Sequence, residues 1–136
     1  MAKAKAKLYP ASLLELMESK TAILMKARAF ADMGMTETAQ PMWTAAASAE
    51  ERIAALLDAL GRSLEAAASR ISAASCYQKS GDFDRAVNLY RAALAGPLRP
   101  KTRRDVLAML ASCLDELSRT SLNGSARRRG KVQAGL

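Results

Sequence analysis

Histidine is absent from the sequence, and its absence removes several common kinds of active site. Histidine is the usual general base near neutral pH, the partner of many serine and cysteine nucleophiles, and a frequent zinc ligand. Cysteine is also scarce, and Cys76 and Cys113 belong to no CxxC motif. Glycine-rich phosphate loops are missing too. We therefore expect no enzyme activity, no cofactor and no metal, with both thiols buried as small hydrophobic groups in a reducing cytoplasm.

Aromatic residues make up only 4% of the chain, which has seven glycines and four prolines among its 136 residues. Alanine is abundant instead, and it favours helices because it loses no side-chain entropy when the backbone coils. Half of the residues are apolar, which is enough for one core at the length of a single domain. The composition therefore predicts an all-α domain.

Long hydrophobic runs are also missing. No stretch approaches the roughly 18 apolar residues of a membrane-spanning helix. The basic start of the chain is not followed by an apolar segment, because Pro10, Ser12, Glu15 and Glu18 interrupt it. Neither a membrane association nor a signal peptide is expected.

Positive charge is concentrated at the two ends of the chain. The net charge is +8, and seven of the 21 basic residues are Lys3, Lys5, Lys7, Arg127, Arg128, Arg129 and Lys131. Between these ends, the remaining 14 basic residues face 13 acidic ones, so the body is nearly neutral. We predict a flexible basic arm over residues 1–10 and a disordered basic tail over residues 121–136. Such tails can contact nucleic acid or an acidic partner without specificity.

Apolar residues recur at helical spacing between these ends and predict about five helices. The expected helices run from a cap at Ser12 to Gly34, then over 36–60, 63–80, 83–95 and 102–120.

Several residues mark the expected helix ends. Ser12 and Glu15 form a capping box, and Asp82 can cap the fourth helix through its carboxylate. Ser48 and Glu51 form another capping box inside the second helix, where Pro41 is also unfavourable. Residues 36–60 could therefore be two helical pieces, although a single helix is our preferred prediction.

Five positions recur at a constant spacing of 47 residues. Phe30, Gly34, Ala39, Trp43 and Ala46 recur as Tyr77, Gly81, Ala86, Tyr90 and Ala93. Each copy spans the turn between two helices. Glycine permits a tight turn, small alanines let paired helices approach, and aromatic rings fill the wedge between them. A ligand platform is the alternative role for Trp43 and Tyr90, but a core position is favoured.

The second copy resembles the tetratricopeptide repeat family, whose pattern is matched by Tyr77, Gly81, Phe83, Ala86, Tyr90 and Ala93. The resemblance covers about residues 20–120, with copies over 20–53 and 67–100 and a cap helix over 102–120. It implies a right-handed stack of antiparallel helix pairs. It also implies a non-enzymatic interaction module or scaffold that binds a protein segment or forms homo-oligomers.

In that family, the first helix of each pair lines a concave groove. Carried over by position, the resemblance implies that the groove residues here are Leu24, Arg28, Asp32, Ile71, Ser75, Gln78, Lys79, Asp105 and Met109.

A basic cluster precedes the fifth helix and consists of Arg99, Lys101, Arg103 and Arg104. The helix dipole disfavours cations at this end, so a contact with an acidic partner competes with a solvated loop as its explanation. Together with Arg127, Arg128 and Arg129, these residues also support an alternative function, that of an accessory protein in RNA or ribonucleoprotein complexes.

Two further groups have open roles. The methionines could form an adaptable binding surface or fill gaps in the core, the second being favoured. The adjacent carboxylates Glu50 and Glu51 are predicted to lie on a solvated face.

Overall fold

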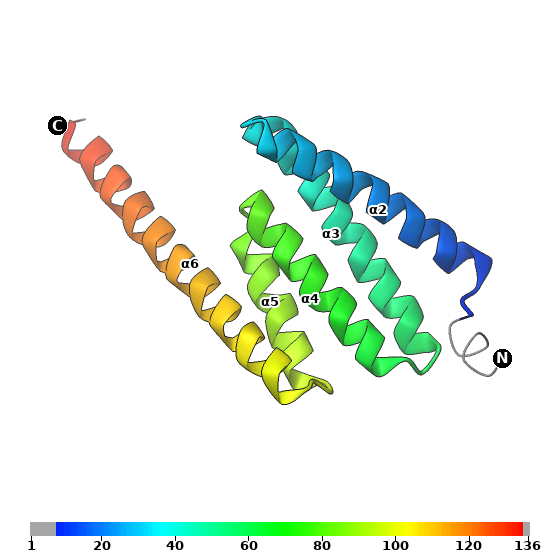
Figure 1. Ribbon diagram of the computed structural model, residues 1–136. Coiled ribbons are helices and arrows are strands. Elements are labelled where there is room, and N and C mark those ends of the chain that lie inside the picture. Colours follow the sequence, from blue (N-terminus) through cyan, green and yellow to red (C-terminus); the bar gives the residue numbers. More distant parts are fainter. Residues whose placement is uncertain (1–7, 135–136) are drawn as a thin grey trace.

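The computed structural model describes residues 8–134, with side chains as far as Leu122. Within this range the chain is all-helical and contains no strand, as the composition predicts. Its five helices, labelled as in Figure 1, are α2 (Ala11–Asp32), α3 (Thr36–Ala59), α4 (Ser63–Ser80), α5 (Phe83–Ala95) and α6 (Pro100–Ala134).

The helices are packed in the order of the chain. α2 packs on α3, α3 on α4, α4 on α5, and α5 on α6, with neighbours running antiparallel (Figure 1). Short connections between consecutive helices make this arrangement the natural one. Among the helices of the described region, none combines the length and apolar character needed to cross a membrane.

The turn between α4 and α5 shows how the repeated glycine works. Gly81 has a φ of +88°, and its N–H donates to the carbonyl of Gln78 over 3.1 Å. The next N–H, from Asp82, donates to the carbonyl of Tyr77 over 2.9 Å. The Asp82 carboxylate then accepts from the backbone N–H of Arg85 over 3.2 Å, which confirms the predicted cap of α5.

Substitution of Gly81 by alanine should lower the free energy of unfolding by about 1–2 kcal/mol, because a Cβ strains the left-handed backbone. Space is not the cause, since the nearest atom to the new Cβ would be Gln40 Nε2 at 3.7 Å. Gly96→Ala is the matched control, because Gly96 has a φ of −100° that alanine adopts readily. Urea unfolding of both variants measures the difference. Equal stabilities would contradict the backbone explanation.

α3 is a single helix, as preferred from the sequence. Pro41 and Ser48 both lie inside it. Proline removes the helical donor for the carbonyl of Glu37, but Glu37 is exposed in the first turn, where water can replace that hydrogen bond. The Ser48–Glu51 capping box is therefore not used.

The predicted N-cap of the first helix, Ser12, is wrong by two residues. α2 begins at Ala11, and its N-cap is Pro10, with no side-chain cap from Ser12. The Pro10 carbonyl accepts from the N–H groups of Leu13 and Leu14 over 3.0 and 3.1 Å. The extended backbone of Pro10 places it just outside the helix, so that Ser12 is already a helical residue.

The predicted tail also needs correction, because the backbone of α6 is helical as far as Ala134. The expected cap helix ended at residue 120, where the composition changes. Single glycines such as Gly124 and Gly130 cost a helix only about 1 kcal/mol each, and the arginines and alanine around them are good helix formers. Residues 135–136 lie outside the described residues.

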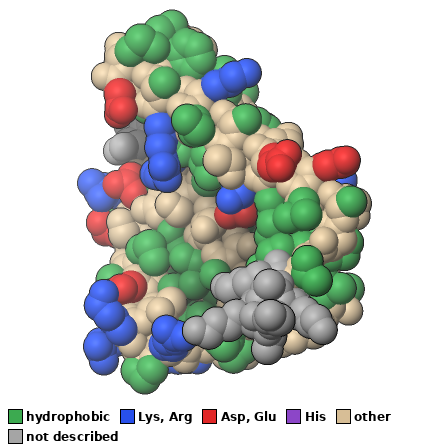
Figure 2. All heavy atoms as spheres, turned by 45° about the vertical axis from the view of Figure 1, so that its right-hand side comes forward, with side chains coloured by type: hydrophobic (Ala, Val, Ile, Leu, Met, Phe, Trp, Pro, Cys, Tyr) green, Lys and Arg blue, Asp and Glu red, His purple; other side chains and the backbone are tan. Residues whose placement is uncertain are grey.

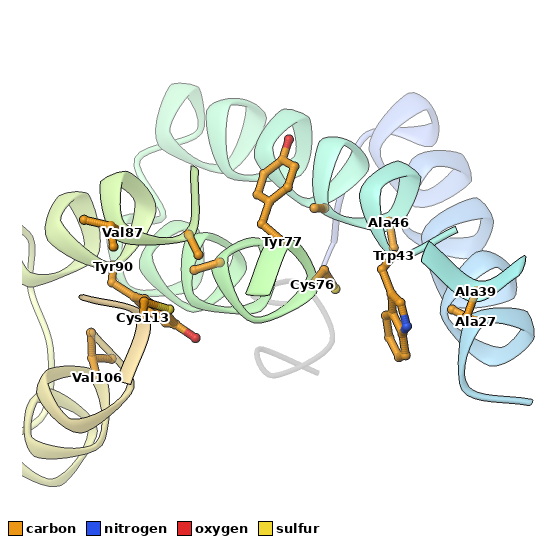
Figure 3. Close-up of a cluster of buried hydrophobic side chains, with 13 residues drawn as sticks. Ala27, Ala39, Trp43, Ala46, Cys76, Tyr77, Val87, Tyr90, Val106 and Cys113 are labelled. Carbon is orange, nitrogen blue, oxygen red and sulfur yellow. The ribbon is translucent and has the colours of Figure 1, made fainter. Parts of the chain in front are cut away.

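The main core joins all five helices and contains the repeated positions. Trp43 is 6% exposed and Tyr90 is fully buried, in the same cluster as Cys76 and Cys113. In Figure 3 the Trp43 and Tyr90 side chains point to one side of the helix array and Tyr77 to the other. The core role predicted for the two aromatic residues and the burial of both thiols are therefore confirmed.

A second, smaller core lies at the other end of α2 and α3, and consists of Leu13, Ile53, Ala54, Leu57 and Ala66. The residues just before α2 are fixed beside it. Tyr9 Oη donates to Glu65 Oε1 over 3.0 Å, and Arg62 Nη2 donates to the carbonyl of Leu8 over 2.8 Å. Leu8 and Tyr9, which the sequence assigned to the flexible arm, are therefore held against the helices, and residues 1–7 lie outside the described residues.

Candidate functional site

An open groove of about 300 Å³ lies between the start of α4 and the start of α6. Its lining is predominantly apolar and consists of Leu64, Glu65, Ala68, Ile71, Pro97, Leu98, Arg99 and Thr102. A concave, mostly apolar surface with a few polar groups is the usual form of a binding site.

One wall of the groove is a single face of α4. Leu64, Ala68 and Ile71 are separated by four and three residues, so they share one face of α4. The connection between α5 and α6 and the first turn of α6 provide the opposite wall, where Leu98 and Thr102 are half-buried. Leu64 is 56% exposed although it is a leucine, so the groove retains apolar surface that the fold itself does not bury.

A second hollow of about 500 Å³ continues the groove along the connection between α3 and α4, sharing Leu64, Glu65 and Pro97 with it. Glu65 is already engaged here, since it accepts from Tyr9 and lies 3.5 Å from the Arg62 guanidinium. Its negative charge is therefore compensated within the protein.

The structure separates the members of the basic cluster. Arg103 donates to the carbonyls of Leu94 and Gly96 over 2.9 and 3.3 Å, so it caps the C-terminal end of α5. Lys101 Nζ lies 3.9 Å from Asp105 on the exposed side of α6.

Arg99 and Arg104 complete the cluster: Arg99 lines the groove, and Arg104 is exposed on α6. The backbone of Arg127, Arg128 and Arg129 belongs to α6, and their side chains lie outside the described residues.

Of the groove residues implied by the family resemblance, Ile71 lines the α4–α6 groove. Two others support Tyr90, whose hydroxyl donates to Gln78 Oε1 over 2.9 Å and lies 3.5 Å from Met109 Sδ. Lys79 Nζ lies 4.6 Å from the centre of the Trp43 ring and covers its face.

The remaining implied residues are not part of the groove lining. Leu24 packs against the main core, Ser75 is half-buried on α4, and Arg28 and Asp32 are exposed near the end of α2. Asp105 forms the exposed ion pair with Lys101.

α2 carries a further apolar hollow of about 390 Å³, lined by Leu14, Met17, Glu18, Thr21, Ala22 and Met25. Figure 2, in which the α2 side comes forward, shows hydrophobic side chains in several groups with charged side chains between them. Some methionines are exposed and others pack against the core. Met25, Met33 and Met35 are exposed, whereas Met42 and Met109 pack against the core.

A polar hollow of about 500 Å³ between α3 and α5 was not predicted, and it is lined by Ser48, Glu51, Tyr77, Arg85, Asn88 and Leu89. Tyr77 Oη donates to Glu51 Oε2 over 2.5 Å, and the Arg85 guanidinium lies 5.5 Å from the Tyr77 ring centre. Burial and the hydrogen bond to Glu51 raise the pKa of Tyr77 to about 12, so the phenol stays protonated at neutral pH.

Glu50 contradicts the prediction of a solvated face, because it is only 4% exposed. Burial raises its pKa, while Lys20 at 3.7 Å and a hydrogen bond with Ser72 act in the opposite direction. A signal was present in the sequence, since Glu50 lies in helical register with Ala46, Ala47 and Ile53, which are all buried.

In the part of the chain that the structure describes, no group of three or more acidic or cysteine side chains is arranged to hold a metal ion. No protein-family model, curated protein or solved structure matches the chain.

Proposed function

We propose that this protein is a non-enzymatic interaction module that binds a segment of another protein in the α4–α6 groove. The groove supports this proposal because it combines exposed apolar side chains from α4 with a polar rim, next to a well-packed core. An extended or helical segment in such a groove would bury the leucine and isoleucine side chains that remain half-exposed in the free protein.

Equivalence of the two helix pairs supports the stacked architecture of a tetratricopeptide-like repeat. Gly34 and Gly81 both adopt a left-handed backbone, and the paired alanines of the two copies are each no more than 1% exposed. Trp43 and Tyr90 each meet a long side chain near the end of α4, Lys79 and Gln78 respectively. Under this proposal, the first helices of successive pairs form the walls of the groove.

The chemistry of the described residues favours binding over catalysis. Burial raises the pKa of both thiols, at Cys76 and Cys113, which keeps them protonated and weakly nucleophilic. We place this activity in the cytoplasm, where free thiols stay reduced.

An RNA-binding function has less support from the described residues. Nucleic-acid platforms need exposed aromatic rings for base stacking. Each aromatic side chain of the described region is buried or half-buried, and Lys79 covers the Trp43 ring. The basic ends remain the basis of this alternative. It predicts binding that weakens steeply with salt and that requires residues 1–7 and 126–136.

Photo-cross-linking within cells would test the proposed groove. A photoreactive amino acid replaces Ala68, which lines the groove, or Ala92, an exposed alanine of α5 that does not. We expect a defined adduct from position 68 only, mapped by mass spectrometry to one segment of a partner. An adduct with a second copy of the chain would show self-association through the groove instead. Equal labelling from both positions would contradict the proposal.

Leu64→Asp should weaken binding of the captured segment by at least about tenfold, because it places a charge on the apolar wall. The fold should survive, since Leu64 is 56% exposed. Leu107→Asp is the matched control, an α6 leucine that is 51% exposed and lies outside the groove lining. Fluorescence anisotropy with the captured segment compares the variants. A similar loss in both would show that binding does not depend on the groove.

A further inference from the structure

The α4–α6 groove has an uneven charge balance. Of the two ionisable residues in its lining, Glu65 is held by Tyr9 and by Arg62. Arg99, on the opposite wall, is exposed and forms no ion pair within the described part of the chain. The groove therefore presents one uncompensated positive charge beside its apolar wall.

The start of α6 adds to this positive potential. The first turn of α6 contains no acidic residue, and Thr102 of that turn lines the groove. Helix N-termini carry a partial positive charge, and an acidic side chain near them is stabilising. Of the neighbouring cations, Lys101 is turned to Asp105 and Arg103 to the end of α5, which leaves Arg99 as the cation that faces the groove.

The α4 wall of the groove also lacks an unpaired carboxylate at its helix start. α4 begins at Ser63 without a side-chain cap, and the only acid of its first turn is Glu65, which is already paired. Both helix starts that border the groove thus lack a free carboxylate of their own.

We propose that the groove selects a protein segment that combines apolar side chains with an acidic one, the carboxylate meeting Arg99 and the start of α6. This specificity rests on the proposed function. The apolar side chains contact Leu64 and Ile71, and supply most of the affinity. The guanidinium can accept a carboxylate in a two-point hydrogen bond, which fixes the direction of the segment.

A phosphate-rich partner fits this surface less well. Nucleic acid would satisfy Arg99, but it would leave Leu64, Ala68 and Ile71 without apolar contacts. A purely apolar segment would cover these side chains and leave Arg99 uncompensated. Only a segment with both chemistries complements the whole lining.

Selection from a display library of short random peptides, against the intact chain, would test this specificity. For the unmodified protein we expect enriched peptides that place aspartate or glutamate next to leucine, isoleucine, phenylalanine or methionine. With Arg99→Glu as the target, the acidic preference should change to lysine or arginine. Arg99→Lys should retain the acidic preference with weaker enrichment, because it preserves charge without the planar fork.

Arg91→Glu is the matched control, since Arg91 is an exposed arginine of α5 outside the groove. It should select the same acidic peptides as the unmodified chain. In anisotropy titrations, the most enriched acidic peptide should bind about tenfold more weakly to Arg99→Glu than to Arg91→Glu. Circular dichroism checks that both variants are folded.

The outcomes separate this inference from the proposed function. Peptides enriched equally for Arg99→Glu and the unmodified chain, but lost with Leu64→Asp, would overturn the charge specificity and leave the groove intact. A shift of preference that appears equally with Arg91→Glu would show a general effect of net charge, and would also overturn it. If no peptide is enriched against any form of the chain, both the specificity and the proposed function fail.

Discussion

Tyr90→Ala is expected to lower the free energy of unfolding by about 3–5 kcal/mol, the cost of deleting a large buried aromatic side chain. Tyr90 is fully buried between α4, α5 and α6, and its hydroxyl contacts Gln78 and Met109. Truncation would leave a cavity and remove the wedge that joins α6 to the preceding helices. Urea unfolding followed by circular dichroism measures the loss.

Tyr90→Phe provides the control for this prediction. Phenylalanine keeps the ring and removes only the hydroxyl, so the expected loss is about 1 kcal/mol. Trp43→Ala should match Tyr90→Ala within the spread of such substitutions, because Trp43 occupies the equivalent position of the first copy. A loss below about 1 kcal/mol at either aromatic position would contradict the view that these rings hold the helix pairs together.

Lys20→Met is expected to destabilise the protein by about 2–4 kcal/mol at neutral pH, because it leaves the buried carboxylate of Glu50 without its cation. Lys20 Nζ lies 3.7 Å from Glu50 Oε1, and the Glu50 side chain is 5% exposed. The expected loss is slightly below that of a fully buried pair, because the Lys20 side chain is 21% exposed. Urea unfolding at several pH values measures it.

The pH dependence provides an internal check. Burial raises the pKa of Glu50 above its ordinary value of 4.5, so the folded state binds this proton more tightly than the unfolded state. The resulting stabilisation is complete below pH 4.5 and is lost as the pH rises through the pKa of the folded state. Lys20→Met raises that pKa further, so its destabilising effect should be small in acid and large at neutral pH.

A double variant separates the ion pair from its surroundings. Lys20→Met combined with Glu50→Leu removes both charges and fills the site with apolar groups, so it should recover most of the lost stability. A double variant as unstable as Lys20→Met alone would show that the loss comes from packing and not from the unpaired carboxylate.

Helix positions were largely predictable because local chemistry determines them. Gly81 and Asp82 mark the α4–α5 turn by backbone freedom and by a carboxylate cap, and both act as expected. The start of α2 and the end of α6 were predicted less well. Pro10 is the N-cap of α2 in place of Ser12. The change in composition near residue 121 does not end α6.

The site was less predictable, because it depends on which elements meet in space. Ile71 was expected in a groove from its place in the repeat, whereas Leu64, Leu98 and Arg99 share one only because α6 begins beside the start of α4. Likewise, the sequence places Arg103 in a basic run, and only the fold brings it to the last carbonyls of α5. Helical spacing shows which residues share a face of one helix, but it does not show which residues of different helices come into contact.

Serial packing of the helices has a mechanical consequence. Each end helix is attached chiefly to a single neighbour, so the array can open from its ends while α3 and α4 remain closed. A segment bound between α4 and α6 would bridge two helices that are separated by α5 in the chain. The bound segment would therefore resist the detachment of α6 from the array.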